Sequence, residues 1–136
     1  MARALPTDLD LLNAIYTSHY RAFADFSEEN KTRSTKIWMP IDIEALAKRF
    51  GTDPDMIFGR LYYHLNGKYA QTMKGDERID FFQMRVGQDR HCVNFPFLAS
   101  VLADLKEDRR RFVVATRIAA LSLVISLVSI AVALFY

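Results

Sequence analysis

Residues 42–67 read DIEALAKRFGTDPDMIFGRLYYHLNG and predict two short helices joined by a tight turn. Asp42 is a suitable N-cap for the first helix, and Gly51 follows its last apolar residue, where a left-handed glycine often ends a helix. The second helix starts directly afterwards with Pro54 at its first position, and residues 66–67 predict its end. Two short helices connected in this way form a helix-turn-helix.

The chain before this pair predicts one long helix, a loop and a short strand. Thr7 is a suitable N-cap, and apolar residues recur at helical spacing as far as Phe26. Residues 27–36 are polar and charged, as expected of a surface loop. Residues 37–39 form a brief apolar run that Pro40 stops, which is typical of an edge strand.

The chain after the pair predicts short strands separated by turns. Residues 68–73 read as an extended lead-in, residues 74–77 as a turn, and residues 79–86 as an imperfectly alternating strand. A second turn at residues 87–90 leads to a returning strand at residues 91–95. We therefore expect a hairpin to follow the second helix.

Two pairs of adjacent aromatic residues lie in this part of the chain, Tyr62 with Tyr63 and Phe81 with Phe82. We expect one ring of each pair to fill the core and the other to point outward. The outward rings are candidates for a contact surface, because aromatic side chains are enriched in protein interfaces.

This order of elements resembles that of winged-helix domains, and the resemblance covers residues 9–105. The helix-turn-helix of the family corresponds to residues 42–65, with the small Ala47 where the helices cross and Gly51 at the turn. The hairpin that follows corresponds to the wing. The resemblance implies an α+β fold, a small winged-helix-like domain that continues into one long helix.

Winged-helix domains often place their second helix in the major groove of DNA. Carried over to this chain, the groove-facing start of that helix would present Asp53, Asp55, Phe58 and Gly59. The charge of its two acidic residues repels phosphate. The positions that can contact a partner or DNA are Arg60, Tyr63, Asn66, Lys68, Arg90 and His91. We expect a protein partner, and DNA remains the alternative.

The end of the chain, residues 118–136, reads IAALSLVISLVSIAVALFY and contains no charged residue. Nineteen helical residues span about 28 Å, which matches a hydrocarbon thickness of ~30 Å. Because no Gly or Pro follows Pro96, we expect a nearly continuous helix over residues 97–136 that ends as a transmembrane segment. The protein is predicted to be tail-anchored.

Four basic residues precede the span and form a collar at the membrane surface: Arg109, Arg110, Arg111 and Arg117. The positive-inside rule then places the N-terminal domain in the cytoplasm, and the expected location is the bacterial inner membrane. The start of the chain lacks the apolar segment of a signal peptide. The predicted organisation is a cytoplasmic domain at residues 1–105, a basic juxtamembrane helix at 106–117 and a transmembrane helix at 118–136.

Small residues recur along one face of the span, at alternating spacings of four and three: Ala115, Ala119, Ser122, Ser126, Ser129 and Ala133. Small side chains let two helices approach closely, and hydroxyl groups can hydrogen-bond across the contact. We call these six residues the small-residue seam and predict that it contacts a second copy of the chain or a partner helix.

Composition argues against catalysis. Arg117 is the only charged residue after Arg111, so residues 1–111 hold 17 of the 18 Lys and Arg residues and all 16 Asp and Glu residues, a net charge of +1. The three histidines are scattered, and His91 and the single Cys92 would point to opposite faces of a strand. We expect no enzyme activity, no metal and no cofactor.

The sequence therefore predicts a membrane-tethered adaptor or regulatory module that assembles with a protein partner at the cytoplasmic face of a bilayer. Two alternatives stay open. One is a membrane-bound DNA-binding regulator, and the other is a small membrane effector whose transmembrane helix oligomerises.

Overall fold

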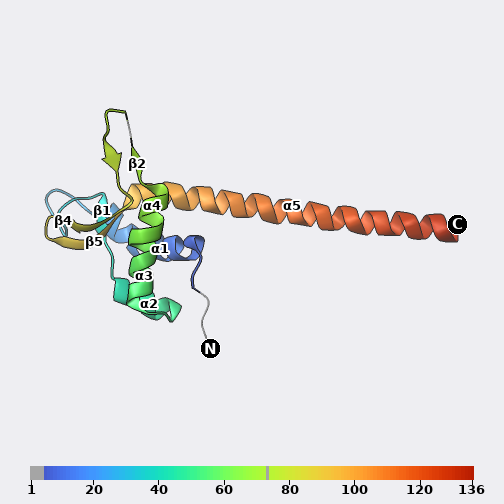
Figure 1. Ribbon diagram of the computed structural model, residues 1–136, viewed down its shortest axis with the longest axis horizontal. Coiled ribbons are helices and arrows are strands. Elements are labelled where there is room, and N and C mark those ends of the chain that lie inside the picture. The colour runs from blue at the N-terminus through green and yellow to red at the C-terminus, as the bar shows by residue number, and fades with distance from the viewer. Residues whose placement is uncertain (1–4, 73) are drawn as a thin grey trace. The chain divides into compact units, whose positions relative to one another are not determined.

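The computed structural model describes residues 5–72 and 74–136, and the chain divides into two compact units at Leu102 and Ala103. The first unit contains helices and a small antiparallel sheet, and the second is the remainder of a long apolar helix (Figure 1). The predicted α+β class with a long C-terminal helix is therefore confirmed.

Helix α1 (Asp8–Ala24) starts where the sequence predicts and ends two residues earlier than expected. The Thr7 hydroxyl accepts a hydrogen bond from the Asp10 amide at 3.1 Å, and the Asp10 carboxylate accepts one from the Thr7 amide at 3.3 Å. This reciprocal capping box satisfies two amide groups that the first turn of a helix leaves free.

The predicted helix pair is present as α2 (Ile43–Phe50) and α3 (Pro54–Gly59). The Asp42 carboxylate accepts a hydrogen bond from the amide of Ala45 at 3.0 Å, and Gly51 ends α2 with a φ of 65°. Both features are the local signals from which the pair was predicted.

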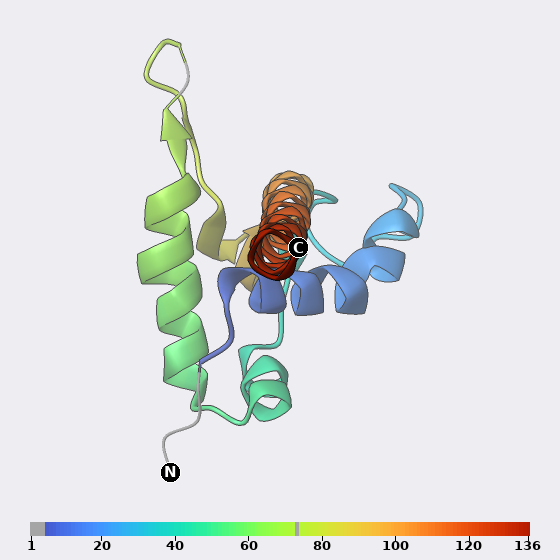
Figure 2. The ribbon, with the colours of Figure 1, turned by 90° about the vertical axis from the view of Figure 1, so that its right-hand side faces the viewer.

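The predicted end of the second helix at residues 66–67 is wrong. From α3 the helix continues through a π-helical segment, η1 (Arg60–Leu65), into α4 (Asn66–Tyr69), as one helical column in Figure 2. The Asn66 side-chain oxygen accepts hydrogen bonds from the amides of Phe81 and Phe82 at 2.9 and 3.1 Å. This tertiary contact holds Asn66 in helical geometry and overrides its preference for a helix end.

The sheet has three antiparallel strands in the order β1-β5-β4, namely β1 (Trp38–Pro40), β5 (Asp89–Asn94) and β4 (Phe82–Val86). The predicted edge strand is present, but it starts at Trp38 and includes Pro40, which was expected to stop it. Strands β4 and β5 form the expected hairpin, with Gln83 opposite Cys92.

A second, two-stranded hairpin divides the predicted strand at residues 79–86. Strand β2 (Gln71–Thr72) pairs with β3 (Arg78–Ile79) across the predicted turn, and β4 starts only at Phe82. Met73, at the end of the predicted lead-in, lies outside the described residues. Strand β4 is therefore shorter than the strand predicted at residues 79–86, because Ile79 belongs to β3 and pairs with β2.

The largest side chains of the core are fully buried and come from all of these elements: Phe81, Phe82, Phe95, Leu11, Leu12, Ile15, Ile57, Leu61, Leu65, Leu98, Val93 and Cys92. The expectation of one inward and one outward ring in each aromatic pair is wrong. Phe81 lies in a bend before β4, so the alternation of a strand does not apply, and both rings of that pair are buried. Tyr62 and Tyr63 are both exposed.

Arg33 anchors the loop between α1 and β1. Its guanidinium donates hydrogen bonds to the carbonyl oxygens of Ala22 at 3.3 Å and Lys36 at 2.8 Å, and it lies 4.6 Å from the centre of the Phe26 ring. Arg33 is the one buried charged residue among those described, and burial lowers the pKa of its guanidinium. The loop is therefore held by the end of α1.

The same loop packs against the turn between β4 and β5. The Ser34 amide donates a hydrogen bond to the Asp89 carboxylate at 2.7 Å, and Gly87 in the turn has a φ of 61°. A Cβ atom at Gly87 would lie 2.6 Å from the Ser34 hydroxyl oxygen. The tip of the hairpin is thus fastened to the loop.

Helix α5 (Phe95–Phe135) is continuous over 41 residues, as the absence of Gly and Pro after Pro96 predicts. The Asn94 side chain accepts a hydrogen bond from the Phe97 amide at 3.3 Å, and Leu98, Val101 and Leu102 are buried in the first unit. Every residue from 106 onward is exposed. By length and composition, this helix can cross a membrane.

Substitutions at two glycines with positive φ distinguish the cost of an unfavourable backbone conformation from the cost of a steric clash. Gly75 has a φ of 86° with open space around it, whereas Gly87 combines positive φ with the close approach of Ser34. We expect Gly75→Ala to lower the free energy of unfolding by about 1 kcal/mol. Gly87→Ala should lower it by about 1–3 kcal/mol more, because the loop must move.

Urea unfolding of the full chain in detergent micelles, followed by fluorescence of the single Trp38, measures both changes. Equal losses for the two variants would contradict the packing of the hairpin tip against the loop.

Candidate interaction surface

Three aromatic side chains on the column from α3 to α4 form a patch that we call the aromatic face: the half-buried Phe58 and the exposed Tyr62 and Tyr63. The ring of Phe58 lies 5.5 Å from that of Tyr62 and 6.2 Å from that of Tyr63, measured between ring centres. Tyr63 is 75% exposed and Tyr62 is 37% exposed. Aromatic rings held in this way lose little conformational entropy on binding.

The aromatic face rests on a second layer of rings. Phe58 makes edge-on contacts with the buried Phe82 at 6.3 Å and with His91 at 5.7 Å between ring centres. Tyr62 contacts Phe82 at 6.4 Å. The face is therefore supported by the sheet rather than by the helix alone.

A groove of about 550 Å³ lies between this helix and β4. Tyr62 and Asn66 line it from the helix, and Met84 and Arg85 line it from the strand. Met84 is 48% exposed, so it extends the apolar surface next to Tyr62. Tyr and Met are enriched in protein interfaces, but the groove is also lined by the charged Arg78, Asp80 and Arg85, so its lining is polar overall.

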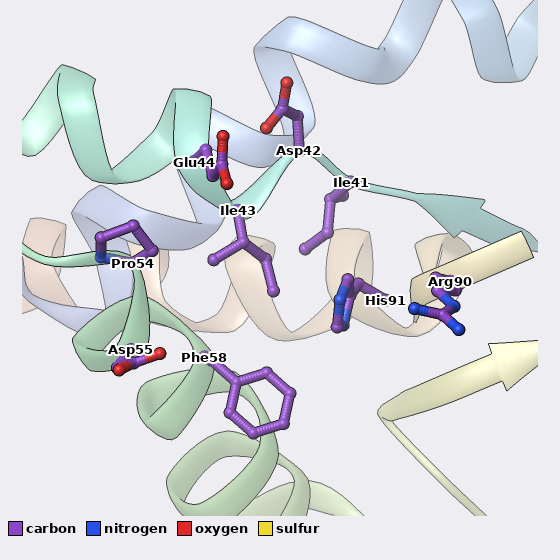
Figure 3. A pocket seen from close by; sticks show the side chains of 9 residues that line it. All are labelled: Ile41, Asp42, Ile43, Glu44, Pro54, Asp55, Phe58, Arg90 and His91. Atoms are coloured by element: carbon purple, nitrogen blue, oxygen red, sulfur yellow. The ribbon is translucent and has the colours of Figure 1, made fainter.

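On the other side of Phe58 lies a pocket of about 500 Å³, shown in Figure 3. It is formed by the first turns of α2 and α3 and by β5, and its lining residues are Ile41, Asp42, Ile43, Glu44, Pro54, Asp55, Phe58, Arg90 and His91. In Figure 3 the carboxylates lie toward the two helices, and the two basic side chains lie on the strand side.

His91 forms part of the pocket wall in an unusual conformation. Its φ is 55°, in the left-handed region that costs a non-glycine residue about 1–2 kcal/mol. Its ring nitrogen Nδ1 is buried and has no hydrogen-bond partner in the described chain. Strain and an unsatisfied polar atom therefore coincide at one residue beside the pocket.

The six predicted contact residues of the soluble domain lie in different surroundings. Arg60 is directed inward and donates hydrogen bonds to the Pro6 carbonyl and the Asp8 carboxylate. The side chain of Asn66 binds the amides at the start of β4. Tyr63 belongs to the aromatic face, and Arg90 and His91 belong to the pocket.

The sixth predicted residue, Lys68, lies beside Asp8 together with Arg60 and His64. Its ammonium is 3.6 Å from the Asp8 carboxylate, and His64 Nε2 is 3.4 Å from the same group. Burial alone would raise the pKa of Asp8, but the hydrogen bond and charge of Arg60, assisted by His64, hold it below its usual value. This cluster joins the start of α1 to the helical column.

The predicted membrane residues all lie on α5 and are exposed. Within the small-residue seam, the Ser126 hydroxyl donates to the Ser122 carbonyl and the Ser129 hydroxyl donates to the Ile125 carbonyl, each at 2.9 Å. These bonds satisfy the hydroxyl groups within the helix, as an apolar environment requires. The contact role of the seam stays a prediction.

No group of three or more His, Cys, Asp or Glu side chains within the described parts of the chain is arranged to hold a metal ion. Cys92 is buried, and burial raises the pKa of its thiol to about 11. A thiol with such a pKa is protonated at neutral pH and is a poor nucleophile.

Met84 and Glu44 were not among the predicted contact residues, and Phe58 was named only as part of the groove-facing start of the second helix. The spacing of four between Phe58 and Tyr62 was a usable signal, because residues so spaced share a helix face. Met84 and Glu44 carried no such signal, since their proximity to the helix depends on the tertiary fold.

Comparison of the chain with protein-family models, with curated proteins and with solved structures finds no match.

The Asp8 cluster makes stability depend on pH in a defined direction. Because the folded pKa of Asp8 lies below the unfolded value, its contribution is fully present above that value, near 3.8, and is lost as pH falls through the folded pKa. Asp8→Asn should lower the free energy of unfolding by about 1.5–3 kcal/mol at pH 7. The difference from the parent chain should shrink as the pH falls below 3.8.

Urea unfolding at a series of pH values measures this difference. Asp104→Asn is the matched control, because Asp104 is exposed on α5 and takes part in no described ion pair. A loss for Asp8→Asn that does not vary with pH would show that the charge of Asp8 is unimportant.

Proposed function

We propose that this protein is a membrane-tethered, winged-helix-like interaction module that assembles with a protein partner at the cytoplasmic face of a membrane. The aromatic face is the surface that binds the partner. Helix α5 is the tether, and the basic collar before the span orients the domain toward the cytoplasm.

The order of elements supports the winged-helix-like assignment. Along the chain, α1, β1, α2 and the α3 column are followed by the hairpin of β4 and β5. The sheet order β1-β5-β4 places the first strand next to the returning strand of that hairpin. The hairpin corresponds to a wing, and the β2–β3 hairpin is an insertion before it.

The exposed aromatic face is the observation on which the proposal depends. The second helix of the pair presents Tyr62 and Tyr63 to solvent and turns Arg60 inward to Asp8. Tyr is enriched in the parts of interfaces that contribute most to binding free energy, and charged side chains are depleted there.

The same helix is poorly suited to DNA. Asp53 and Asp55 stand at its start, and no basic side chain in its first turn offsets their repulsion of phosphate. The hairpin tip is held to the loop through Asp89 and Ser34, so it is not free to follow a DNA groove. A protein partner therefore fits this surface better.

Site-specific photo-crosslinking in cells of the source organism tests the aromatic face. The full chain with p-benzoylphenylalanine in place of Tyr63 should give a discrete crosslinked species. The same replacement at Tyr20, which is 52% exposed on α1, should not give it. Tyr62→Ala in the Tyr63 crosslinking chain should reduce the yield by about tenfold, because a truncated interface aromatic commonly costs 1–2 kcal/mol or more.

Identical crosslinking patterns from both positions would refute a specific contact at the aromatic face. Salt-dependent binding of duplex DNA by the full chain in micelles, lost on Lys68→Ala and Arg90→Ala, would instead support the membrane-bound DNA-binding regulator.

The small-residue seam generates a separate prediction for the membrane segment. Replacing Ser122, Ser126 and Ser129 with Leu should weaken self-association or partner association in the membrane by about tenfold or more, since each small or hydroxyl contact contributes about 0.6–2 kcal/mol. The control variant carries Ala120→Leu, Val124→Leu and Ala131→Leu, which add bulk on the opposite face.

Energy transfer between labelled chains in vesicles measures self-association, and co-purification measures a partner. Equal effects of the two triple variants would exclude the seam as the contact. Growth arrest on expression that depends only on the span would favour the small membrane effector.

A further inference from the structure

We propose that one side of α5, just before the uncharged span, binds the headgroups of anionic phospholipids. We call this side the basic face, and it consists of Lys106, Arg109, Arg110 and Arg117. The inference rests on the tether of the proposed function, because headgroups lie within reach of these side chains only when α5 crosses a membrane.

The spacing of the four basic residues places them on one side of the helix. Helix α5 is continuous from Phe95 to Phe135 (Figure 1), so residues three, four or seven apart share a face. Positions 106 and 110 are four apart, positions 110 and 117 are seven apart, and position 109 follows 106 by three. All four side chains are exposed, so this side presents four positive charges to its surroundings.

The opposite side of the same segment is acidic. It carries Asp104, Glu107 and Asp108 together with Arg111, each three or four positions from another member. The Arg111 Nε atom lies 3.3 Å from the Glu107 carboxylate. Three negative charges and one positive charge leave −2 on this side, against +4 on the basic face. The collar predicted from the sequence is therefore divided, because Arg111 lies among the acidic residues.

The positions of the basic residues along the helix suit a headgroup layer. Arg117 directly precedes the uncharged residues 118–136, so its long side chain can reach from the hydrocarbon boundary to the headgroups. Arg110 lies about 10 Å and Lys106 about 16 Å farther along the helix axis. The polar layer of one leaflet is about 5–8 Å thick. Arg109 and Arg110 therefore stand at its outer edge, and Lys106 acts through its charge within a screening length of ~10 Å.

The chemistry of these side chains selects an anionic phosphodiester. A guanidinium group binds two phosphate oxygens at once, and three of the four residues are arginines. Within the described parts of the chain, none of the four takes part in an ion pair. A zwitterionic headgroup carries its own ammonium and competes poorly for such a site, whereas a headgroup with net negative charge gains from each nearby Lys or Arg.

The basic face points away from the small-residue seam. Ala115, the first residue of the seam, follows Arg111 by four positions, so the seam continues the acidic side of the helix. A partner helix on the seam would therefore leave the basic face in contact with lipid.

Electron paramagnetic resonance of spin-labelled lipids tests the proposal. The full chain is reconstituted into phosphatidylcholine vesicles that contain a trace of spin-labelled phosphatidylglycerol or spin-labelled phosphatidylcholine. The spectral component from lipid restricted by the helix gives the association constant of each lipid. Phosphatidylglycerol should associate more tightly than phosphatidylcholine, and this preference should decrease at high salt because exposed charges are screened.

Two neighbouring substitutions separate the basic face from a uniform ring of charge. Arg110→Gln should lower the preference for phosphatidylglycerol by about three- to fivefold. Arg111→Gln is the matched control, because it makes the same change of net charge one position away on the acidic side and should leave the preference nearly unchanged. Far-UV circular dichroism verifies that both variants keep their helix content.

Equal effects of Arg110→Gln and Arg111→Gln would overturn the proposal, as would equal association of the two lipids with the parent chain. Displacement of phosphatidylglycerol by inorganic phosphate, at a constant ionic strength, would overturn it in favour of a soluble phosphate ligand. Displacement by a DNA duplex would overturn it in favour of the membrane-bound DNA-binding regulator.

The same spectra distinguish this failure from failure of the proposed function. A restricted component of equal size for both lipids would leave the tether valid and refute only the basic face. No restricted component with either lipid would refute the tether and the basic face together. The Tyr63 crosslink reports on the aromatic face independently of both.

Discussion

The helix that runs from Pro54 to Tyr69 buries Ile57, Leu61 and Leu65 completely, and the rest of the domain depends on this stripe. Residues four apart lie on one helix face, so the stripe decides where every neighbouring side chain points. Tyr62 and Tyr63 are left on the exposed side, and Arg60 is turned toward Asp8. The composition of the surface thus follows from the packing of the core.

Two polar contacts hold this helix in place against the rest of the domain. The Asp8 carboxylate receives the Arg60 guanidinium from one end of α1, and the Asn66 side chain binds the start of β4. Each joins segments more than ten residues apart in the sequence, so each depends on the folded state. These contacts fix the position of the helix, so the aromatic face is formed before a partner binds. A pre-formed surface lowers the entropic cost of binding.

The proposed module combines two surfaces with different physical bases. In the soluble domain, aromatic rings supported by the sheet suit a partner with an apolar surface. On α5, small residues suit close approach of a second helix in a medium where the hydrophobic effect between helices is absent. A partner that uses both would gain affinity from the membrane, because both molecules are confined to it.

Local chemistry alone predicted the starts of the helices, the α+β class and the long apolar helix. The residues that start or end these helices act within their own turn, so their roles can be predicted without a tertiary structure: Thr7, Asp42, Gly51 and Pro54. The length and charge of residues 118–136 are likewise properties of the chain itself.

The tertiary structure decided what depends on distant contacts. Asn66 continues a helix that its type would end, because two amides from the sheet require its oxygen. Phe81 and Phe82 are both buried because a bend at Phe81 interrupts the alternation of the strand. Arg60, predicted as a contact residue, is bound to Asp8, which is 52 positions away along the chain. No local pattern encodes such pairings, because the energy that selects them arises only when the core brings those segments together.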